Sequence, residues 1–113
     1  WVILAGNSGV HQFCKIGAHA FVGMYSGVNK DVPPFVTTIG MPAGPAAINT
    51  EGMKRRGFES DEIMAVRRAY KAFYRKSLGV DEAIELLAED AAKFPAVQLM
   101  IDFVKSSERG IVR

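Results

Sequence analysis

The stretch LAGNSGVHQFCKIGAHAFVGMYSGV, residues 4–28, carries an aliphatic residue at every sixth position. These residues are Leu4, Val10, Ile16, Val22 and Val28, and small residues follow three of them, at Ala5, Gly17 and Gly23. Neither the helical period of about 3.6 residues nor the two-residue alternation of an amphipathic strand gives this spacing. A parallel β-helix does, because each hexad supplies a short strand and a turn, with the aliphatic side chain inside and the small residue at the bend. The sequence therefore predicts β-helix turns over residues 1–34.

The hexads are too few to form a stable coil by themselves. Such a coil takes three hexads per turn, so five hexads make less than two turns. Repeat proteins need about three or more stacked units before burial offsets the entropy of ordering the chain. The sequence also begins at Trp1 inside an apolar run, without an initiator methionine. We therefore expect the C-terminal part of a longer protein, with the remaining turns upstream of Trp1.

Two further parts are expected after the coil. Residues 32–34 read Val-Pro-Pro, and because proline has no backbone donor we expect the strand ladder to end there. Residues 35–58 are rich in glycine and proline and predict an extended, substrate-contacting loop. Residues 59–113 have helical apolar spacing and predict a three-helix domain. The predicted fold is the last turns of a parallel β-helix followed by a C-terminal α-helical bundle.

The first expected helix has Ser60 as its N-cap, and its apolar stripe consists of Ile63, Val66, Tyr70 and Phe73. Its acidic residues lie in the first turn and its basic residues, which include Lys76, lie near the end, as the helix dipole favours. The second helix is expected over residues 81–93. The third is expected to open at Pro95, since proline suits the first turn of a helix.

The composition is that of a globular domain. Of the 113 residues, 49% are hydrophobic and 23% are charged, which excludes the signature of disorder. No apolar run approaches the roughly 18 residues of a membrane span, and no export signal opens the sequence. Cys14 is the single cysteine, so neither an internal disulfide nor a CxxC pair is possible. We expect a cytoplasmic protein without a membrane span.

The net charge of +2 conceals a basic block. Residues 1–53 are balanced, residues 54–76 hold eight bases against three acids, and residues 77–113 sum to −3. A local excess of this kind favours an anionic partner, such as a phosphate group or an acidic protein, over a nucleic acid. The two histidines lie eight residues apart and show no metal-binding pattern, so no metal site is expected.

Two motifs and the helical tail give the sequence a family resemblance. Residues 10–14 read VHQFC, and residues 49–58 read NTEGMKRRGF. With the tail, they resemble the acyl-carrier-protein-dependent UDP-N-acetylglucosamine O-acyltransferases, which begin lipid A synthesis in Gram-negative bacteria. The resemblance implies a homotrimer of left-handed β-helices with active sites between subunits. It implies transfer of an (R)-3-hydroxyacyl group from acyl carrier protein to the 3-hydroxyl of UDP-N-acetylglucosamine, with no cofactor beyond the carrier-protein thioester.

The resemblance also assigns substrate-binding residues. His11 and Gln12 match positions beside the sugar and the acyl group, although a lone histidine can equally cap a coil turn. Positions around the nucleotide are matched by Asn49, Glu51, Arg55 and Arg56. Arg56 is expected at the diphosphate, because a guanidinium makes paired, charge-assisted bonds. The alternative is that residues 54–56 form a solvated basic turn.

Other roles follow from the same resemblance. The general-base histidine is expected upstream of Trp1, so neither His11 nor His19 inherits it, and His19 receives no substrate role. Arg55 and the bases of the first helix are candidates for binding the acidic carrier protein. Met24, where some members of the family have glycine, is expected to limit acyl-chain length, with ten-carbon donors preferred. Its alternative role is that of a flexible core filler.

Two other functions remain open at this point. One is another hexapeptide-repeat acyltransferase, acting on an amine or using an acetyl donor. The other is a non-catalytic, trimeric β-helical scaffold, which would need the hexads but no convergence of polar residues.

Overall fold

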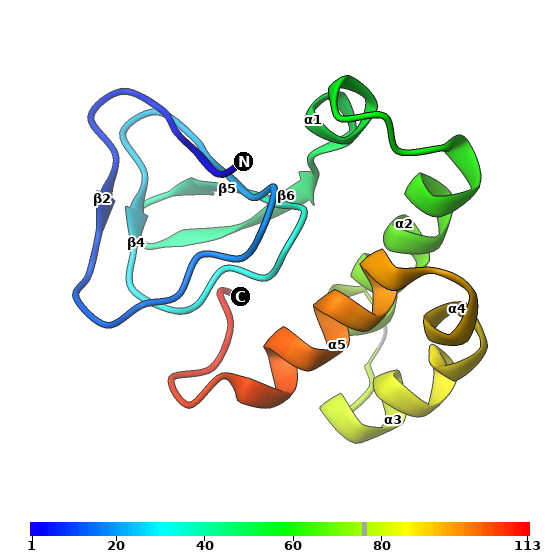
Figure 1. The fold of residues 1–113 in the computed structure, drawn as a ribbon. Helices are drawn as coiled ribbons and strands as arrows, with labels where there is room; N and C mark the ends of the chain where they lie inside the picture. Colours follow the sequence, from blue (N-terminus) through cyan, green and yellow to red (C-terminus); the bar gives the residue numbers. More distant parts are fainter. Residues whose placement is uncertain (76) are drawn as a thin grey trace.

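The computed structural model describes residues 1–75 and 77–113, so Lys76 of the basic block lies outside the described residues. The strands are β1 (Ile3–Leu4), β2 (Gly9–Val10), β3 (Phe21–Val22), β4 (Gly27–Val28), β5 (Val36–Gly40) and β6 (Ala43–Ile48). The helices are α1 (Thr50–Arg55), α2 (Ser60–Tyr74), α3 (Val80–Leu86), α4 (Ala88–Lys93) and α5 (Pro95–Ser106). The strands wind through coil turns on one side of the molecule, and the helices gather on the other (Figure 1).

Hexads three repeats apart pair in parallel, as the period predicts. β1 pairs with β3, which places Leu4 beside Val22, and β2 pairs with β4 in the same register. A third contact joins Ile16 to Val32, two residues short of three hexads. Val22 and Val28 are buried, and burial of such a side chain contributes about 1.5 to 3 kcal/mol. Leu4 is 55% exposed, because no described residues form a turn above it.

The bends of the coil differ from the sequence-based expectation. The corner residues Asn7, Phe13, His19 and Tyr25, six apart, have φ between 57° and 67°. The small residues Ala5, Gly17 and Gly23 begin three of these turns, as expected, but the positive φ at the third position of each turn was not predicted. Gly23 is small for another reason: a Cβ there would lie 2.9 Å from Ile39 Cγ2 in the next turn. The glycine therefore makes room for stacking.

The coil continues past the two prolines. Pro34 lies in a turn with Phe35, where no ladder donor is needed, and β5 then pairs in parallel with β3. β6 folds back antiparallel to β5, and the sheet order is β1-β3-β5-β6. The expected end of the ladder at residues 32–34 is therefore wrong. Residues 35–58, expected as an extended loop, instead form β5, β6 and α1, and the division of the chain into three parts stays a prediction.

The helices also correct two expectations. Ser60 is the first residue of α2, and the N-cap is Glu59, which makes no capping hydrogen bond through its side chain. The helix expected over residues 81–93 is two helices, α3 and α4, which meet at Leu87. The third opens at Pro95, as predicted. No helix in residues 1–75 and 77–113 is long and apolar enough to cross a membrane.

The helices pack on one another and on the sheet. α2 contacts α3, α5 and β6, and its buried face includes Val66 and Phe73. α5 buries Val97 and Met100 against the same core. The Glu62 carboxylate accepts a hydrogen bond from the Ala96 N–H at 3.2 Å, which joins the starts of α2 and α5. α2 thus packs both on other helices and on the sheet of the coil.

The segment after α5 returns to the coil. Asp31, a buried carboxylate, accepts hydrogen bonds from the Lys15 N–H at 2.8 Å and the Ser107 hydroxyl at 2.7 Å. Its own N–H donates to the Gly110 carbonyl, and its carbonyl accepts from the Val112 N–H. One residue therefore ties the coil to the end of the helical region.

Candidate functional site

A cleft of about 200 Å³ lies between α1 and a corner of the coil. It is called the α1 cleft here and is lined by Trp1, Ile3, His19, Phe21, Asn49, Glu51, Gly52, Arg55 and Arg56. All the residues that the sequence assigns to the nucleotide end of a substrate are among them. The coil supplies the aromatic wall, and α1 with its cap supplies the charged one.

Asn49 is fixed at the base of the α1 cleft. Its side-chain oxygen caps α1 by accepting from the Gly52 N–H at 3.1 Å, and its amide nitrogen donates to the His19 carbonyl at 3.0 Å. A Cβ at Gly52 would lie 2.8 Å from Asn49 Cγ, so glycine is needed at this spacing. Each group of an amide has a second bonding direction. Asn49 therefore keeps one donor and one acceptor for a ligand.

The two arginines of the α1 cleft are free to bind anions. Within residues 1–75 and 77–113, the one ion pair joins Arg68 to Asp90, so neither Arg55 nor Arg56 has a carboxylate partner. The Arg56 guanidinium lies over the Trp1 ring, 3.5 Å from its centroid. Such stacking attracts a cation and leaves its N–H edges open. The arrangement suits a phosphate oxygen better than a buried ion pair would.

His19 forms the inner wall of the same cleft. Its ring stacks on Phe35, with centroids 5.4 Å apart, and meets the Phe58 ring edge-on at 5.2 Å. Burial lowers the pKa of His19, and the positive charge of Arg56 lowers it further. The imidazole is therefore neutral near physiological pH and offers one donor and one acceptor.

His11, Gln12 and Met24 lie outside the α1 cleft. His11 and Gln12 are exposed on the corner after β2, with His11 Nδ1 2.9 Å from the Gln12 carbonyl oxygen. Met24 is 65% exposed on another corner, above Gly6 in the preceding turn. Met24 therefore does not fill the core of this single chain, and its role in limiting acyl-chain length stays a prediction. The single chain does not bring these three residues to the nucleotide residues.

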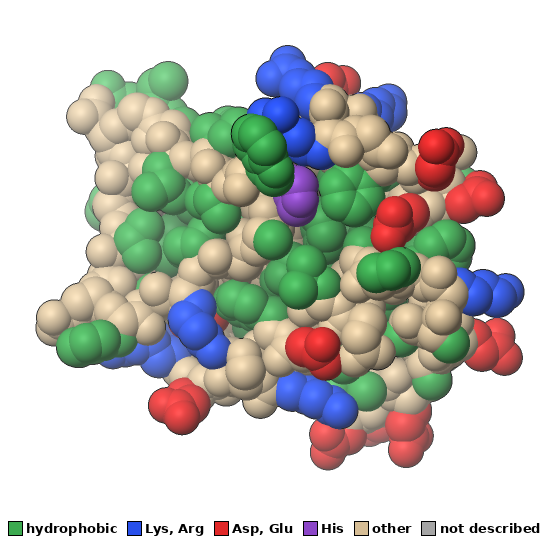
Figure 2. Space-filling model, in the orientation of Figure 1, with side chains coloured by type: hydrophobic (Ala, Val, Ile, Leu, Met, Phe, Trp, Pro, Cys, Tyr) green, Lys and Arg blue, Asp and Glu red, His purple; other side chains and the backbone are tan. Residues whose placement is uncertain are grey.

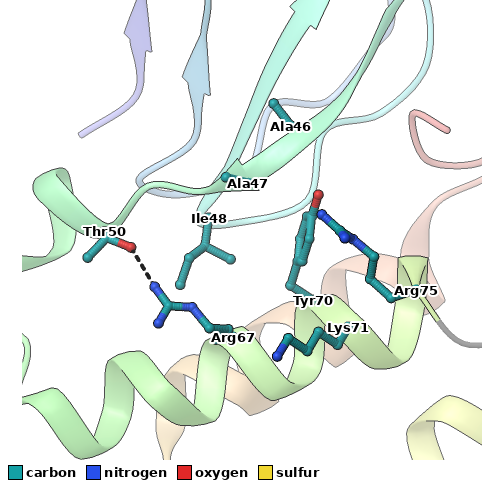
Figure 3. Close-up of a pocket in the computed structure, with 8 residues that line it drawn as sticks. All are labelled: Ala46, Ala47, Ile48, Thr50, Arg67, Tyr70, Lys71 and Arg75. Carbon is teal, nitrogen blue, oxygen red and sulfur yellow. Dashed lines mark hydrogen bonds between the residues drawn. The ribbon is translucent and has the colours of Figure 1, made fainter.

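A second hollow, the basic groove, lies between β6 and α2 (Figure 3). It has a volume of about 190 Å³ and is lined by Ala46, Ala47, Ile48, Thr50, Arg67, Tyr70, Lys71 and Arg75. Arg67 donates to the Thr50 hydroxyl at 3.1 Å, and Arg67, Lys71 and Arg75 follow one another along the face of α2 that borders β6 (Figure 3).

The basic residues of the segment 55–75 thus lie in three places: the α1 cleft, the basic groove and an ion pair with Asp90. Lys and Arg side chains gather over α1 at the top of the molecule, and acidic side chains are scattered over the helical side (Figure 2). Arg68 lies outside the groove and makes two hydrogen bonds to Asp90, at 2.8 and 2.9 Å. That pairing raises the pKa of Arg68 and lowers the pKa of Asp90. Arg68 is therefore the residue of the basic block whose charge is balanced by an ion pair.

Comparison with known proteins decides the family. The protein-family model described as UDP N-acetylglucosamine O-acyltransferase, domain 2, matches residues 31–112. The chain belongs to the UDP-N-acetylglucosamine O-acyltransferase family. Relatives from Pseudomonas fluorescens and Thiobacillus denitrificans, both named acyl-[acyl-carrier-protein]–UDP-N-acetylglucosamine O-acyltransferase, are 55% and 51% identical over 113 residues. The chain spans 44% of the length of each, less than half of the O-acyltransferases that it matches.

Solved O-acyltransferase structures share the fold of this chain. LpxA from Acinetobacter baumannii superimposes with a TM-score of 0.94 at 43% identity, over 99% of this chain and 44% of that one. The UDP-N-acetylglucosamine O-acyltransferase (LpxA) from Moraxella catarrhalis gives 0.94 at 44% identity, with the same coverage.

Several residues of the α1 cleft were not predicted from the O-acyltransferase motifs. Trp1, Ile3 and Phe21 belong to the coil and were given no role at the nucleotide, and His19 was given no substrate role. They reach the cleft because β1 and β3 lie side by side, one turn apart. The six-residue period contained this signal, since it places residues 1–4 beside residues 19–22.

Proposed function

We propose that the protein to which this chain belongs transfers an (R)-3-hydroxyacyl group from acyl carrier protein to the 3-hydroxyl of UDP-N-acetylglucosamine, the first step of lipid A biosynthesis. The observation that carries the proposal is the convergence of Asn49, Glu51, Arg55 and Arg56 on one cleft. Among the described residues, neither guanidinium group has a carboxylate partner. A scaffold would not need this convergence. The family match argues against the N-acyl and acetyl alternatives.

The α1 cleft has the chemistry for a nucleoside diphosphate. Arg56 binds a phosphate oxygen through charge-assisted hydrogen bonds, and Arg55 adds positive charge at the rim. The remaining donor and acceptor of Asn49 suit a uracil edge, while the exposed Glu51 carboxylate accepts from ribose hydroxyls. Binding of the nucleotide part positions the sugar hydroxyl for reaction, which converts binding energy into proximity.

The transfer forms an ester and breaks a thioester. The sugar 3-hydroxyl oxygen attacks the thioester carbonyl, a general base takes its proton, and the carbon–sulfur bond breaks to release the carrier-protein thiol. The general base is a histidine upstream of Trp1. His11 and Gln12 orient the sugar and the acyl group through their donors and acceptors. No cofactor or metal takes part.

The assembly proposed is a homotrimer in which the coil turns are the last turns of a left-handed parallel β-helix and the helices form a small bundle. The separation of His11 and Gln12 from the α1 cleft supports this assembly. A threefold ring places the corner of one subunit beside the cleft of the next and completes each site. The proposed location is the cytoplasm.

Two further contacts are proposed for the acyl donor. The acidic carrier protein docks on Arg55 and the basic groove, where three bases lie without acidic neighbours in the groove lining. Met24, exposed on its corner, limits the length of the acyl chain between subunits. A methionine there occupies the space of several methylene groups, so a ten-carbon donor fits better than a fourteen-carbon one.

The test is a transfer assay with the full-length protein. Hydroxyacyl-carrier protein and UDP-N-acetylglucosamine are mixed with the enzyme, and the released carrier-protein thiol is measured together with the acylated nucleotide sugar by mass spectrometry. We expect one thiol per acylated sugar. Release of thiol without an O-acylated sugar, or acylation at an amine, would reject the proposed reaction.

A further inference from the structure

We propose that His19 is a further ligand-binding residue of the α1 cleft, and that its ring N–H donates a hydrogen bond to the phosphate group that Arg56 binds. The inference rests on the proposed function, since it requires a nucleoside diphosphate in the cleft. It assigns a role to a residue that neither sequence motif includes.

The first argument is that contacts with two aromatic rings hold the His19 ring in one orientation. One face of His19 lies against Phe35 with an interplanar angle of 8°, and Phe58 meets the ring at 87°. Phe35 and Phe58 also contact one another at 5.5 Å, so the three rings form a closed cluster. Aromatic contacts of this kind favour a fixed relative orientation. His19 also lines the α1 cleft.

The second argument is that the ring nitrogens of His19 make no hydrogen bond within residues 1–75 and 77–113. In the part of the chain that the structure describes, the hydrogen bond at His19 is made by its backbone carbonyl, which accepts from Asn49. An imidazole that packs on two aromatic rings but leaves both nitrogens without a protein partner has polar groups available for a ligand or water. The side chain of neighbouring Asn49, in contrast, already donates one hydrogen bond and accepts one within the protein.

The third argument locates the ligand group. His19 and Arg56 both line the α1 cleft, whose volume is only about 200 Å³, and the charge of Arg56 contributes to lowering the pKa of His19. A neutral ring beside a guanidinium adds a donor without adding like-charge repulsion. An anionic oxygen held by Arg56 therefore lies on the same side of the cleft as the His19 edge. A uracil or ribose bound by Asn49 and Glu51 would not use the hydrogen bond from the His19 ring.

The test compares UDP with uridine in the full-length protein. His19→Phe keeps a ring for Phe35 and Phe58 but removes the N–H. We expect it to weaken UDP binding by about tenfold, the usual effect of one lost hydrogen bond to a charged group. Uridine binding, followed by NMR, and the unfolding temperature should stay as in the wild type.

Two further variants separate the possible outcomes. Phe58→Leu loosens the ring cluster but keeps the imidazole, so it should reduce UDP affinity less than His19→Phe does. Arg56→Ala reports on the proposed nucleotide site itself. If Arg56→Ala loses UDP binding while His19→Phe binds UDP as the wild type does, the role of His19 is rejected and the proposed function stands. Equal losses of UDP and uridine in His19→Phe and Phe58→Leu would mean a purely structural role. A wild-type protein that binds no UDP would overturn both.

Discussion

The α1 cleft and the basic groove are neighbours, because two successive residues line one each. Asn49 lines the cleft, whereas Thr50 lines the groove. The cleft combines two cations with an amide, a carboxylate, an imidazole and an indole. The groove offers three cations, a hydroxyl and a phenol over strand backbone. Mixed donors and acceptors can orient a small ligand, whereas like charges in a row attract an extended anionic surface with little orientation. The difference separates a nucleotide site from a docking site within one basic block.

The largest expected effect comes from a residue in neither site. Met24→Gly should change the preference for a longer acyl donor by on the order of a hundredfold, since four more buried methylenes contribute about 3 kcal/mol. The affinity for UDP-N-acetylglucosamine should stay unchanged, because Met24 does not line the α1 cleft. Relative kcat/KM values for ten-, twelve- and fourteen-carbon donors measure the change. An identical ranking in both proteins would show that Met24 does not limit chain length.

The next prediction compares a basic residue of the α1 cleft with a basic residue of the same segment that lies outside both sites. Arg56→Ala should weaken UDP-N-acetylglucosamine binding about ten- to a hundredfold, because it removes a charge-assisted contact to phosphate. Arg68→Ala is the matched control, since Arg68 is already paired with Asp90 outside both sites. Isothermal titration of the full-length variants gives both values. Equal losses would contradict a dedicated role for Arg56.

A smaller effect is expected in the groove. Lys71→Glu should raise the KM for the acyl-carrier-protein donor about fivefold to tenfold and leave the KM for the nucleotide sugar unchanged, since it reverses one charge facing an acidic partner. Added salt should reduce the difference between variant and wild type, because screening weakens exposed charges. If salt and the substitution affect the two substrates equally, the cleft and the groove are not separate sites.

The smallest effect concerns the neutralised pair. A double-mutant cycle on Arg68 and Asp90 should give about 0.2 to 1 kcal/mol, since both side chains are partly exposed. The Arg68 hydrogen bond lowers the pKa of Asp90 in the folded state, so its contribution is present above the unfolded-state pKa. It is lost as the pH falls through the folded-state pKa. Denaturant unfolding near neutral pH and in acid measures the coupling energy with Asp90 charged and with Asp90 protonated. A coupling energy that grows in acid would contradict the pairing.

The coil was easier to predict than its bends. A period of six specifies which residues stack, because inward side chains must repeat in register, and Leu4 accordingly lies beside Val22. The bends were missed because non-glycine residues such as Phe13 and Tyr25 carry no compositional sign of positive φ. Pro34 was interpreted as a stop, although a turn position needs no donor.

The part of the candidate site that is contiguous in sequence was predicted. Residues 49–56 form one cap and one short helix, so their spacing alone brings them together. Trp1 and His19 enter the cleft through pairing between turns, which a motif does not contain. The break at Leu87 was missed for a similar reason, because the apolar spacing of residues 81–93 continues across it.

The bonds around Asp31 have a consequence for how the molecule opens. The amide protons of Lys15, Asp31 and Val112 are held at one buried residue, and they come from regions far apart in the sequence. Local opening of the coil at this point must release the segment after α5, and the reverse also holds. In native-state hydrogen exchange, these three amides should therefore share one opening free energy and exchange as a single cooperative unit. Ser107→Ala should lower their protection together, while amides of α3, which Asp31 does not contact through these bonds, keep theirs.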